Sequence, residues 1–212
     1  DQGTTSSRVV LFDTKGNIKF ISQYEFKQYF PRNGWVEHNP NEIWSTTIKA
    51  LKQVIKKAIS LKGHILTIGI TNQRETTILW NKKTGKPIYN AIVWQDRRTQ
   101  EYCKSLKNKN YENTFRKKTG LFIDPYFSAT KIKWILDNVK VSKKLLKTNN
   151  LLFGTVDTFL IWKLTKGKQH LTEATNASRT MLFNINNNKW DNEILQKLKI
   201  PRSILPEVKN SA

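Results

Sequence analysis

The chain has 212 residues, which is enough to bury the core of one domain. Its content of 38% hydrophobic and 11% aromatic residues excludes an intrinsically disordered polypeptide. The net charge of +21 raises nucleic acid as a partner, but the lysines are scattered among asparagines without the interleaved aromatic residues of a single-strand binding surface. A basic nucleic-acid-binding module is therefore a remote alternative, and we expect no nucleic acid partner.

Cysteine usage and hydropathy bear on the compartment. Cys103 is the only cysteine and cannot form an internal disulfide, which is typical of a reducing compartment. No apolar run approaches the roughly 18 to 20 residues that a membrane span needs. We expect a cytoplasmic protein with no membrane span.

The chain opens on D-Q-G-T-T-S-S-R at residues 1–8, directly before the apolar stretch Val9–Phe12. A carboxylate at a strand end, followed by glycine and hydroxyl residues in a tight hairpin, can present donors to a phosphate and its metal ion. We interpret Asp1 as a magnesium-side residue, and Gly3–Ser6 with Arg8 as phosphate-binding groups. A solvent-facing hairpin corner has a similar composition, so that alternative stays open. A buried strand should lead into Asp1, and we expect the sequence to be part of a longer chain.

A helix is predicted to begin at Pro40, with Asn39 as its N-cap and Glu42 three residues after the cap. Apolar residues then recur every three or four positions, as expected of one buried helix face. That face consists of Trp44, Ile48, Leu51, Ile55 and Ala58.

The other elements follow from periodicity and turn residues, and together they indicate an α/β protein. They are a hairpin of 8–13 and 18–26 with its turn at 14–17, a buried strand at 65–70, a strand at 78–80, a turn at 83–85, an apolar stretch through 92–94, helices at 101–107, 111–118 and 131–139, an apolar segment at 153–164, and short turns at 201–206.

Two further places carry candidate binding residues. Arg74 and Glu75 directly follow the predicted strand at 65–70, and a guanidinium beside a carboxylate suits the hydroxyls of a small polyol. An internal ion pair between the two is the alternative. Trp94 could pack against the carbon atoms of a ligand, and Tyr126 could present its hydroxyl from a turn, although a core residue and a packed corner explain them as well.

Seven long segments, in the same order along the chain, resemble the amino-terminal domain of the FGGY carbohydrate kinases. The segment at 126–138 fits a signature shared by sugar kinases, and N-Q-R-E-T at 72–76 points to the members that phosphorylate glycerol. The seven segments are D-Q-G-T-T-S-S-R at 1–8, G-W-V-E-H-N-P-N-E-I-W at 34–44, G-I-T-N-Q-R-E-T-T at 69–77, P-I-Y-N-A-I-V-W-Q-D-R-R-T at 87–99, T-G-L-F-I-D-P-Y-F-S-A-T-K-I-K-W-I-L-D at 119–137, L-L-F-G-T-V-D-T-F-L-I-W-K-L-T at 151–165 and T-N-A-S-R-T-M-L-F-N-I at 175–185.

The resemblance implies a ribonuclease-H-like, actin-like ATPase fold with a mixed five-stranded sheet flanked by helices. Matched by position, it implies that Thr4, Thr5, Ser6 and Arg8 contact the phosphates of ATP, with Asp1 on the magnesium side, through water.

The resemblance also implies a substrate site. Arg74, Glu75 and Tyr126 would hydrogen-bond the three hydroxyls of glycerol, Trp94 would cover its carbon face, and Thr4 is counted with this set as well. The implied reaction is ATP-dependent phosphorylation of glycerol to glycerol 3-phosphate, with ATP and Mg²⁺ as cofactors. A kinase of another polyol or sugar in the same family is the alternative.

The resemblance finally implies that residues 1–212 are an N-terminal, glycerol- and phosphate-binding domain truncated at both ends. In the family, the aspartate that acts as general base and the C-terminal nucleotide-binding domain lie farther along the chain. We therefore expect no catalytic residue in this chain, and no useful activity from it alone. A homo-oligomer is expected because family members often form dimers or tetramers.

Overall fold

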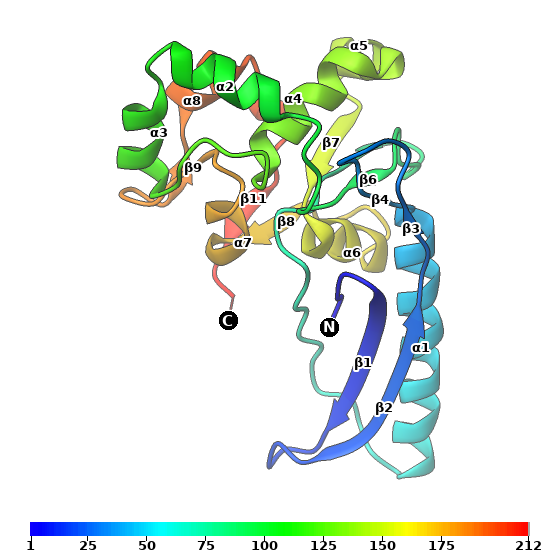
Figure 1. The fold of residues 1–212 in the computed structure, drawn as a ribbon. Coiled ribbons are helices and arrows are strands. Elements are labelled where there is room, and N and C mark those ends of the chain that lie inside the picture. Colours follow the sequence, from blue (N-terminus) through cyan, green and yellow to red (C-terminus); the bar gives the residue numbers. More distant parts are fainter. Residues whose placement is uncertain (212) are drawn as a thin grey trace.

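The computed structural model describes residues 1–211. In Figure 1 the molecule has an elongated lower part and a mainly helical upper part. The lower part is the hairpin of β1 (Ser6–Phe12) and β2 (Ile18–Glu25) lying along α1 (Pro40–Ser60). In the upper part, β5 (Ile78–Asn81) pairs antiparallel with β7 (Leu151–Gly154).

The remaining elements are short and complete the upper part. The strands are β3 (Gln28–Tyr29), β4 (Glu37–His38), β6 (Ala91–Ile92), β8 (Leu171–Glu173), β9 (Phe183–Asn184), β10 (Lys189–Trp190) and β11 (Glu207–Lys209). The helices are α2 (Gln100–Asn108), α3 (Glu112–Thr119), α4 (Ser128–Asn138), α5 (Lys140–Lys147), α6 (Val156–Leu164), α7 (Ala174–Ser178), α8 (Asn192–Leu198) and the 3₁₀ turn η1 (Arg202–Ile204).

Two clusters of buried apolar side chains stabilise these parts. The larger one fills the upper part and includes Phe115, Ile132 and Phe153. The smaller one joins the start of α1 to α6 and β5, with Ile43 and Trp80 at its centre. Burial of this apolar surface is the main force that holds the hairpin and helix α1 to the upper part.

The predicted start of α1 and the burial of Ala58 are confirmed, whereas the buried residues Ile43, Ala50 and Val54 each lie one position before a predicted one. The Asn39 side chain accepts a hydrogen bond from the Asn41 N–H at 2.9 Å, as an N-cap should. The buried residues are Ile43, Ala50, Val54 and Ala58, whereas Trp44, Ile48, Leu51 and Ile55 are only half-buried. On the side of the helix that faces the hairpin, the hydroxyls of Thr46 and Thr47 contact the Ser7 hydroxyl of β1.

The strand predicted at 65–70 is wrong. The segment has no regular secondary structure, and Leu66 is 80% exposed. A strand requires a hydrogen-bonded neighbour, and within residues 1–211 this segment has only the isolated bridge between Gln2 and Asn72 near its end. A cavity of about 950 Å³ lies between it and β1. Its apolar lining includes Val9, Leu11, Leu51, Val54, Ile65, Leu66, Ile68, Ile70, Leu160 and Leu164.

The missing strand at 65–70 also changes the expected sheet. Strands and helices occur together in the α/β manner, but the mixed five-stranded sheet is not continuous in the described part of the chain. The strands there pair in small sheets, of which β3–β4–β6 is the largest with three strands. The expected sheet is interrupted where 65–70 makes no ladder with β1.

Most other predicted elements are confirmed to within a few residues. They are the hairpin with its turn at 14–17, the strand at 78–80, the helices at 101–107, 111–118 and 131–139, and the turns after 200. The apolar segment at 153–164 is the end of β7 followed by α6, and its acid Asp157 is buried. No helix within residues 1–211 has both the length and the apolar character required to cross a membrane.

Candidate substrate and phosphate site

The turn at the start of the chain lies against the loop that carries Arg74 and Glu75. The Gln2 N–H donates to the Thr71 carbonyl at 2.8 Å, and the Gln73 N–H donates to the Gln2 carbonyl at 2.6 Å. These two backbone hydrogen bonds place the predicted phosphate turn and the predicted polyol-binding loop next to each other.

Trp94 connects the turn at residues 1–8 to Tyr126. Its indole Nε1 donates to the Thr4 Oγ1 at 3.1 Å, and its ring centroid lies 5.5 Å from that of Tyr126. Trp94 follows β6, and its side chain is half-buried, so one face of the ring is held by protein while part of it stays accessible. Thr4, Trp94 and Tyr126 therefore form one continuous surface.

Glu75 is buried, yet its partner is not its neighbour in sequence. Its carboxylate Oε1 accepts a hydrogen bond from Arg179 Nε at 2.6 Å. Arg74 is exposed, and within residues 1–211 no ion pair joins it to Glu75. The alternative of an internal Arg74–Glu75 ion pair is therefore wrong. Arg74 instead lines a second cavity of about 660 Å³ together with Asn176 and other residues.

The backbone at Glu75 is in the left-handed region, with φ at 66°. A residue with a Cβ adopts this conformation at an energetic cost, and it is found most often where the surrounding structure fixes it. Two hydrogen bonds fix it here. The Thr76 N–H donates to the Arg74 carbonyl at 2.8 Å, and the Ser128 hydroxyl donates to the Glu75 carbonyl at 2.9 Å.

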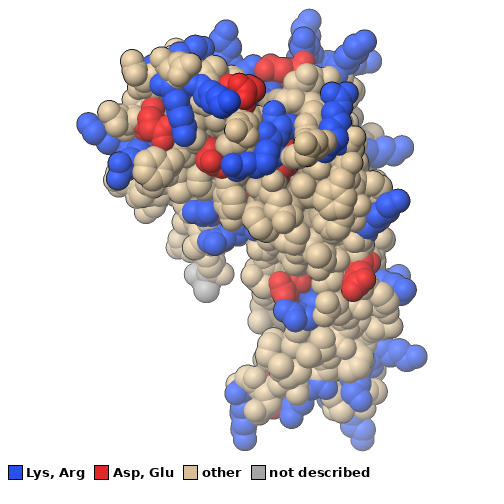
Figure 2. Space-filling view, in the orientation of Figure 1, with Lys and Arg blue, Asp and Glu red and all other residues tan. Residues whose placement is uncertain are grey.

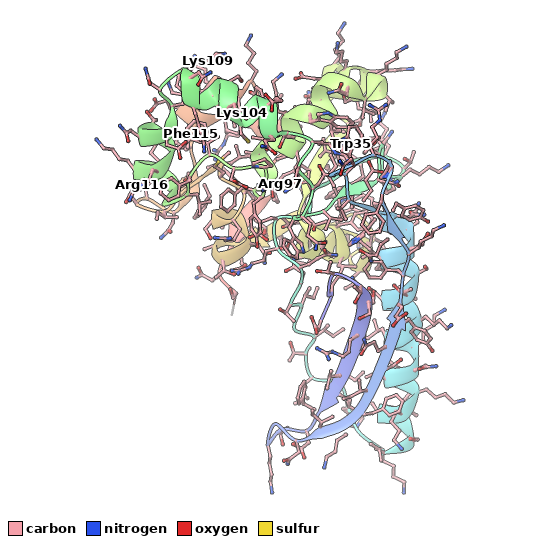
Figure 3. All side chains as sticks on the ribbon, viewed as in Figure 1. Trp35, Arg97, Lys104, Lys109, Phe115 and Arg116 are labelled. Atoms are coloured by element: carbon pink, nitrogen blue, oxygen red, sulfur yellow. The ribbon has the colours of Figure 1, made fainter. Side chains whose placement is uncertain are left out.

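Tyr126 lies in the loop before α4, and several groups hold that loop. Its N–H donates to Asp124 Oδ1 at 2.8 Å, and Asp124 also pairs with Arg97 at 3.1 Å near the centre of Figure 3. The fully buried Lys131 ammonium donates to the carbonyls of Tyr126 and Phe127. Burial lowers the pKa of Lys131 to about 7, although nearby carboxylates oppose the shift.

The hydroxyl residues of the first turn differ in their availability. Thr5 is exposed, so its hydroxyl is open to a ligand. Ser6 is buried, and its Oγ accepts a hydrogen bond from Gln23 Nε2 at 2.8 Å. The Gly3 N–H donates to the Ser6 carbonyl at 2.9 Å and closes the turn. The Thr5 hydroxyl is therefore more accessible to a ligand than the Ser6 hydroxyl, which is buried in the hairpin.

Asp1 and Arg8 form an ion pair, with the guanidinium donating to the carboxylate. Both side chains are partly exposed, so the pair is worth little in stability and can be rearranged by a ligand. Within residues 1–211 no cluster of three or more His, Cys, Asp or Glu side chains could enclose a metal ion. A magnesium ion bound through one carboxylate, waters and nucleotide phosphates would still fit Asp1, because Mg²⁺ commonly keeps most of its waters.

Arg179 was not singled out from the sequence. It ends the short helix α7, 104 positions after Glu75, and nothing in its local sequence indicates a carboxylate partner. Only its place in the T-N-A-S-R-T segment at 175–180, one of the seven resembling segments, pointed to that region.

Comparison with known proteins shows the family of the chain. The profile of the FGGY family of carbohydrate kinases, N-terminal domain, matches residues 1–212. The chain belongs to the FGGY family of carbohydrate kinases. It is 56% identical to a glycerol kinase of Petrotoga mobilis and 57% identical to one of Geobacillus sp., in both cases over all of this chain and 43% of the relative. The chain thus spans less than half the length of these curated FGGY relatives.

Solved structures of FGGY kinases have the same fold. The glycerol kinase of Plasmodium falciparum, solved with ADP, superposes with a TM-score of 0.93 at 39% identity, covering 98% of this chain and 42% of that one. A gluconate kinase from Lactobacillus acidophilus superposes with a TM-score of 0.85 at 23% identity, covering 98% of this chain and 40% of that one, which bears on the fold alone. These similarities confirm the α/β, actin-like fold class of the chain.

Proposed function

We propose that this chain is the amino-terminal domain of an enzyme that transfers the γ-phosphoryl group of ATP to glycerol, giving glycerol 3-phosphate. The observation that carries the proposal is the contact of Trp94 with both Thr4 and Tyr126, because it joins the phosphate turn to the polyol-binding residues. The relatives named glycerol kinase, at 56% and 57% identity over the whole chain, support the same substrate.

Glycerol would lie against Trp94, with its hydroxyls bound by Arg74, Glu75 and Tyr126. The Arg74 guanidinium is exposed and can donate to hydroxyl oxygens, while the Glu75 carboxylate accepts from a hydroxyl proton. The indole ring covers the carbon atoms and excludes water from one side. Three polar contacts and one apolar surface would fix the accepting hydroxyl in one orientation.

The phosphates of ATP would lie at the first turn, where Thr4, Thr5, Ser6 and Arg8 offer donors. Thr5 is the most accessible hydroxyl of the three, whereas Ser6 is buried and accepts a hydrogen bond from Gln23 while its own O–H stays available as a donor. Asp1 would hold Mg²⁺ through water, and the ion would neutralise charge on the phosphate oxygens. Arg8 would then exchange the Asp1 carboxylate for a phosphate.

We propose that residues 1–212 supply substrate binding but not the general base, which would come from the rest of a longer chain together with the nucleotide-binding domain. A missing base alone typically costs about 10²- to 10⁴-fold in rate. The enzyme would be cytoplasmic and would form a homo-oligomer.

The test is a comparison of the intact parent protein with the 212-residue chain. We expect the parent to phosphorylate glycerol with ATP and the chain alone to show no measurable turnover. Preference of the parent for a pentulose or another polyol in a substrate panel would contradict the glycerol assignment. Equal turnover by the two proteins would contradict the need for a second domain.

A matched pair of variants tests the binding site in the parent enzyme. Glu75→Gln should lower kcat/KM for glycerol by about 10- to 100-fold, since a hydrogen bond to a charged group is lost. Glu207→Gln is the control, because Glu207 is exposed at the edge of β11. An unchanged kcat/KM in Glu75→Gln would show that Glu75 does not bind the substrate.

A further inference from the structure

Three segments far apart in sequence are joined by hydrogen bonds around Glu75: the loop of Glu75 itself, the start of α4 and the end of α7. The Ser128 hydroxyl donates to the Glu75 carbonyl at 2.9 Å, and the Ala129 N–H donates to the Thr180 carbonyl at 2.9 Å. Arg179 closes the triangle by donating from Nε to Glu75 Oε1 at 2.6 Å. The first and last of these contacts fix the backbone and the carboxylate of the same residue.

Arg179 also contacts the loop that carries Tyr126. Its guanidinium carbon lies 5.6 Å from the ring centroid of Tyr126 and 5.0 Å from that of Phe127. A cation at this distance from a ring face is attracted to it. One guanidinium therefore interacts with two of the side chains that the proposed function assigns to glycerol.

The ion pair with Arg179 uses one oxygen of the Glu75 carboxylate and leaves the other available to a ligand. Oε1 is engaged by Arg179, whereas no side chain or N–H among residues 1–211 donates to Oε2. The Glu75 side chain is only 3% exposed, so its orientation is set by these few partners and not by solvent. A carboxylate held by one oxygen can accept a hydroxyl proton with the other in a fixed direction.

We propose that Arg179 is a positioning residue for the polyol pocket. It holds the Glu75 carboxylate and the Tyr126 ring in the geometry that accepts a three-carbon polyol, without touching the substrate itself. This inference rests on the proposed function, because it concerns the same pocket. A purely structural role would instead affect folding and both substrates alike.

The test uses the intact parent enzyme and three variants. Arg179→Gln removes the charge, Arg179→Lys keeps the charge but loses the planar Nε donor, and Arg202→Gln is the matched control. Arg202 donates to the Trp190 carbonyl at 3.2 Å, so it is a structural arginine at another place in the fold. KM for glycerol, KM for ATP, kcat and the midpoint of thermal unfolding are measured for each.

We expect Arg179→Gln to raise KM for glycerol by about 30-fold or more, because the buried Glu75 carboxylate loses its charged partner. KM for ATP should stay within about twofold, and Arg179→Lys should recover part of the glycerol affinity. Arg202→Gln should leave both KM values unchanged. An Arg179→Gln enzyme with normal KM for glycerol would overturn the inference and leave the proposed function intact.

A double-mutant cycle with Glu75→Gln gives a second readout that does not depend on stability alone. If Arg179 acts through Glu75, Arg179→Gln should cost much less in the Glu75→Gln background than in the wild type. Equal costs in both backgrounds would overturn the inference. If Arg179→Gln fails to fold, Arg179→Lys takes its place in the cycle with the same criterion.

The outcomes separate the two proposals. A wild-type enzyme that prefers another polyol, with a raised KM for that polyol in Arg179→Gln, would contradict glycerol and support the positioning role. A wild-type enzyme that phosphorylates no polyol would overturn both.

Discussion

At the scale of single residues, the site depends on side chains that hold other side chains. Trp94 reaches Thr4 through its indole N–H and Tyr126 through its ring. Glu75 is held by Arg179, and the loop of Tyr126 is held by Lys131. Glu75 and the loop of Tyr126 are thus each oriented by a residue that was not itself a candidate.

The hydrogen bond from Trp94 to Thr4 can be tested by Trp94→Phe, which keeps a ring and removes the donor. We expect kcat/KM of the parent enzyme to fall by roughly 3- to 10-fold, since a neutral hydrogen bond contributes about 1 kcal/mol. Trp44→Phe is the control, because the indole of Trp44 donates no hydrogen bond within residues 1–211 and lies on α1. Equal effects of the two substitutions in steady-state kinetics would argue against a role for the Thr4 contact.

His38 gives a prediction on pH. The ring is buried, with Nε2 2.6 Å from Gln28 Oε1 and Nδ1 3.2 Å from Gln73 Nε2. Burial lowers the pKa of His38 to about 4, while the charge of Glu42 opposes the shift. The unfolded chain has an ordinary histidine pKa of about 6.5, so between these values it binds more protons than the folded chain. Stability is therefore lost as the pH falls from about 6.5 to about 4, by at most about 3 kcal/mol from this group.

Urea unfolding at several pH values measures this dependence. His38→Gln should flatten the loss of stability between pH 6.5 and 4, whereas His64→Gln should not, because His64 is exposed. A slope in His38→Gln equal to that of the wild type would contradict the assignment.

At the scale of elements, local sequence signals were sufficient to predict the helices, because the backbone hydrogen bonds of a helix lie within the helix. Helix α1 begins where its cap and proline predict, and α4 buries Ile132, Ile135 and Leu136 as its periodicity predicts. The segment 65–70 shows the limit. Its apolar pattern is typical of a buried strand, but a strand needs a partner in the ladder, and pattern alone does not supply one.

The junction of β7 and α6 provides a test at this scale. A Cβ at Gly154 would lie 2.6 Å from Thr158 Cβ and 2.9 Å from the Trp80 ring. Gly154→Ala should lower the free energy of unfolding by about 1 to 3 kcal/mol, because the helix cannot move away from the strand without opening the core. Gly69→Ala is the matched control, since a Cβ added at position 69 would have no atom within 4 Å. Chemical denaturation of the two variants that gave equal midpoints would contradict this packing.

At the scale of the whole molecule, the net charge of +21 arises from lysines and arginines scattered along the whole sequence. Lys and Arg side chains are spread over both the upper and the lower part of the face in Figure 2. Lys109 and Arg116 lie at the periphery of the upper part in Figure 3. A field of this kind attracts anions such as nucleotides in general, and the basic side chains on the face in Figure 2 do not line one groove.

The chain should therefore bind nucleic acid only weakly. At about 150 mM salt we expect a Kd for random-sequence duplex DNA weaker than about 1 μM, in the range of non-specific binding. Fluorescence anisotropy with a salt titration measures it. Sub-micromolar affinity that persists at this salt concentration would favour the nucleic-acid-binding alternative over a role confined to small substrates.

Local turn chemistry, caps and periodicity were enough to predict the hairpin and the principal helices, and seven segments in a fixed order were enough to indicate the family. The sequence also indicated the candidate residues in the first turn and in the loop that carries Arg74 and Glu75. The tertiary structure alone decided that Glu75 pairs with Arg179 and not with Arg74, that Trp94 joins the two corners, and that 65–70 forms no strand. These outcomes depend on which distant segments meet in space, and a linear pattern does not encode the spatial distance between residues that lie far apart in the sequence.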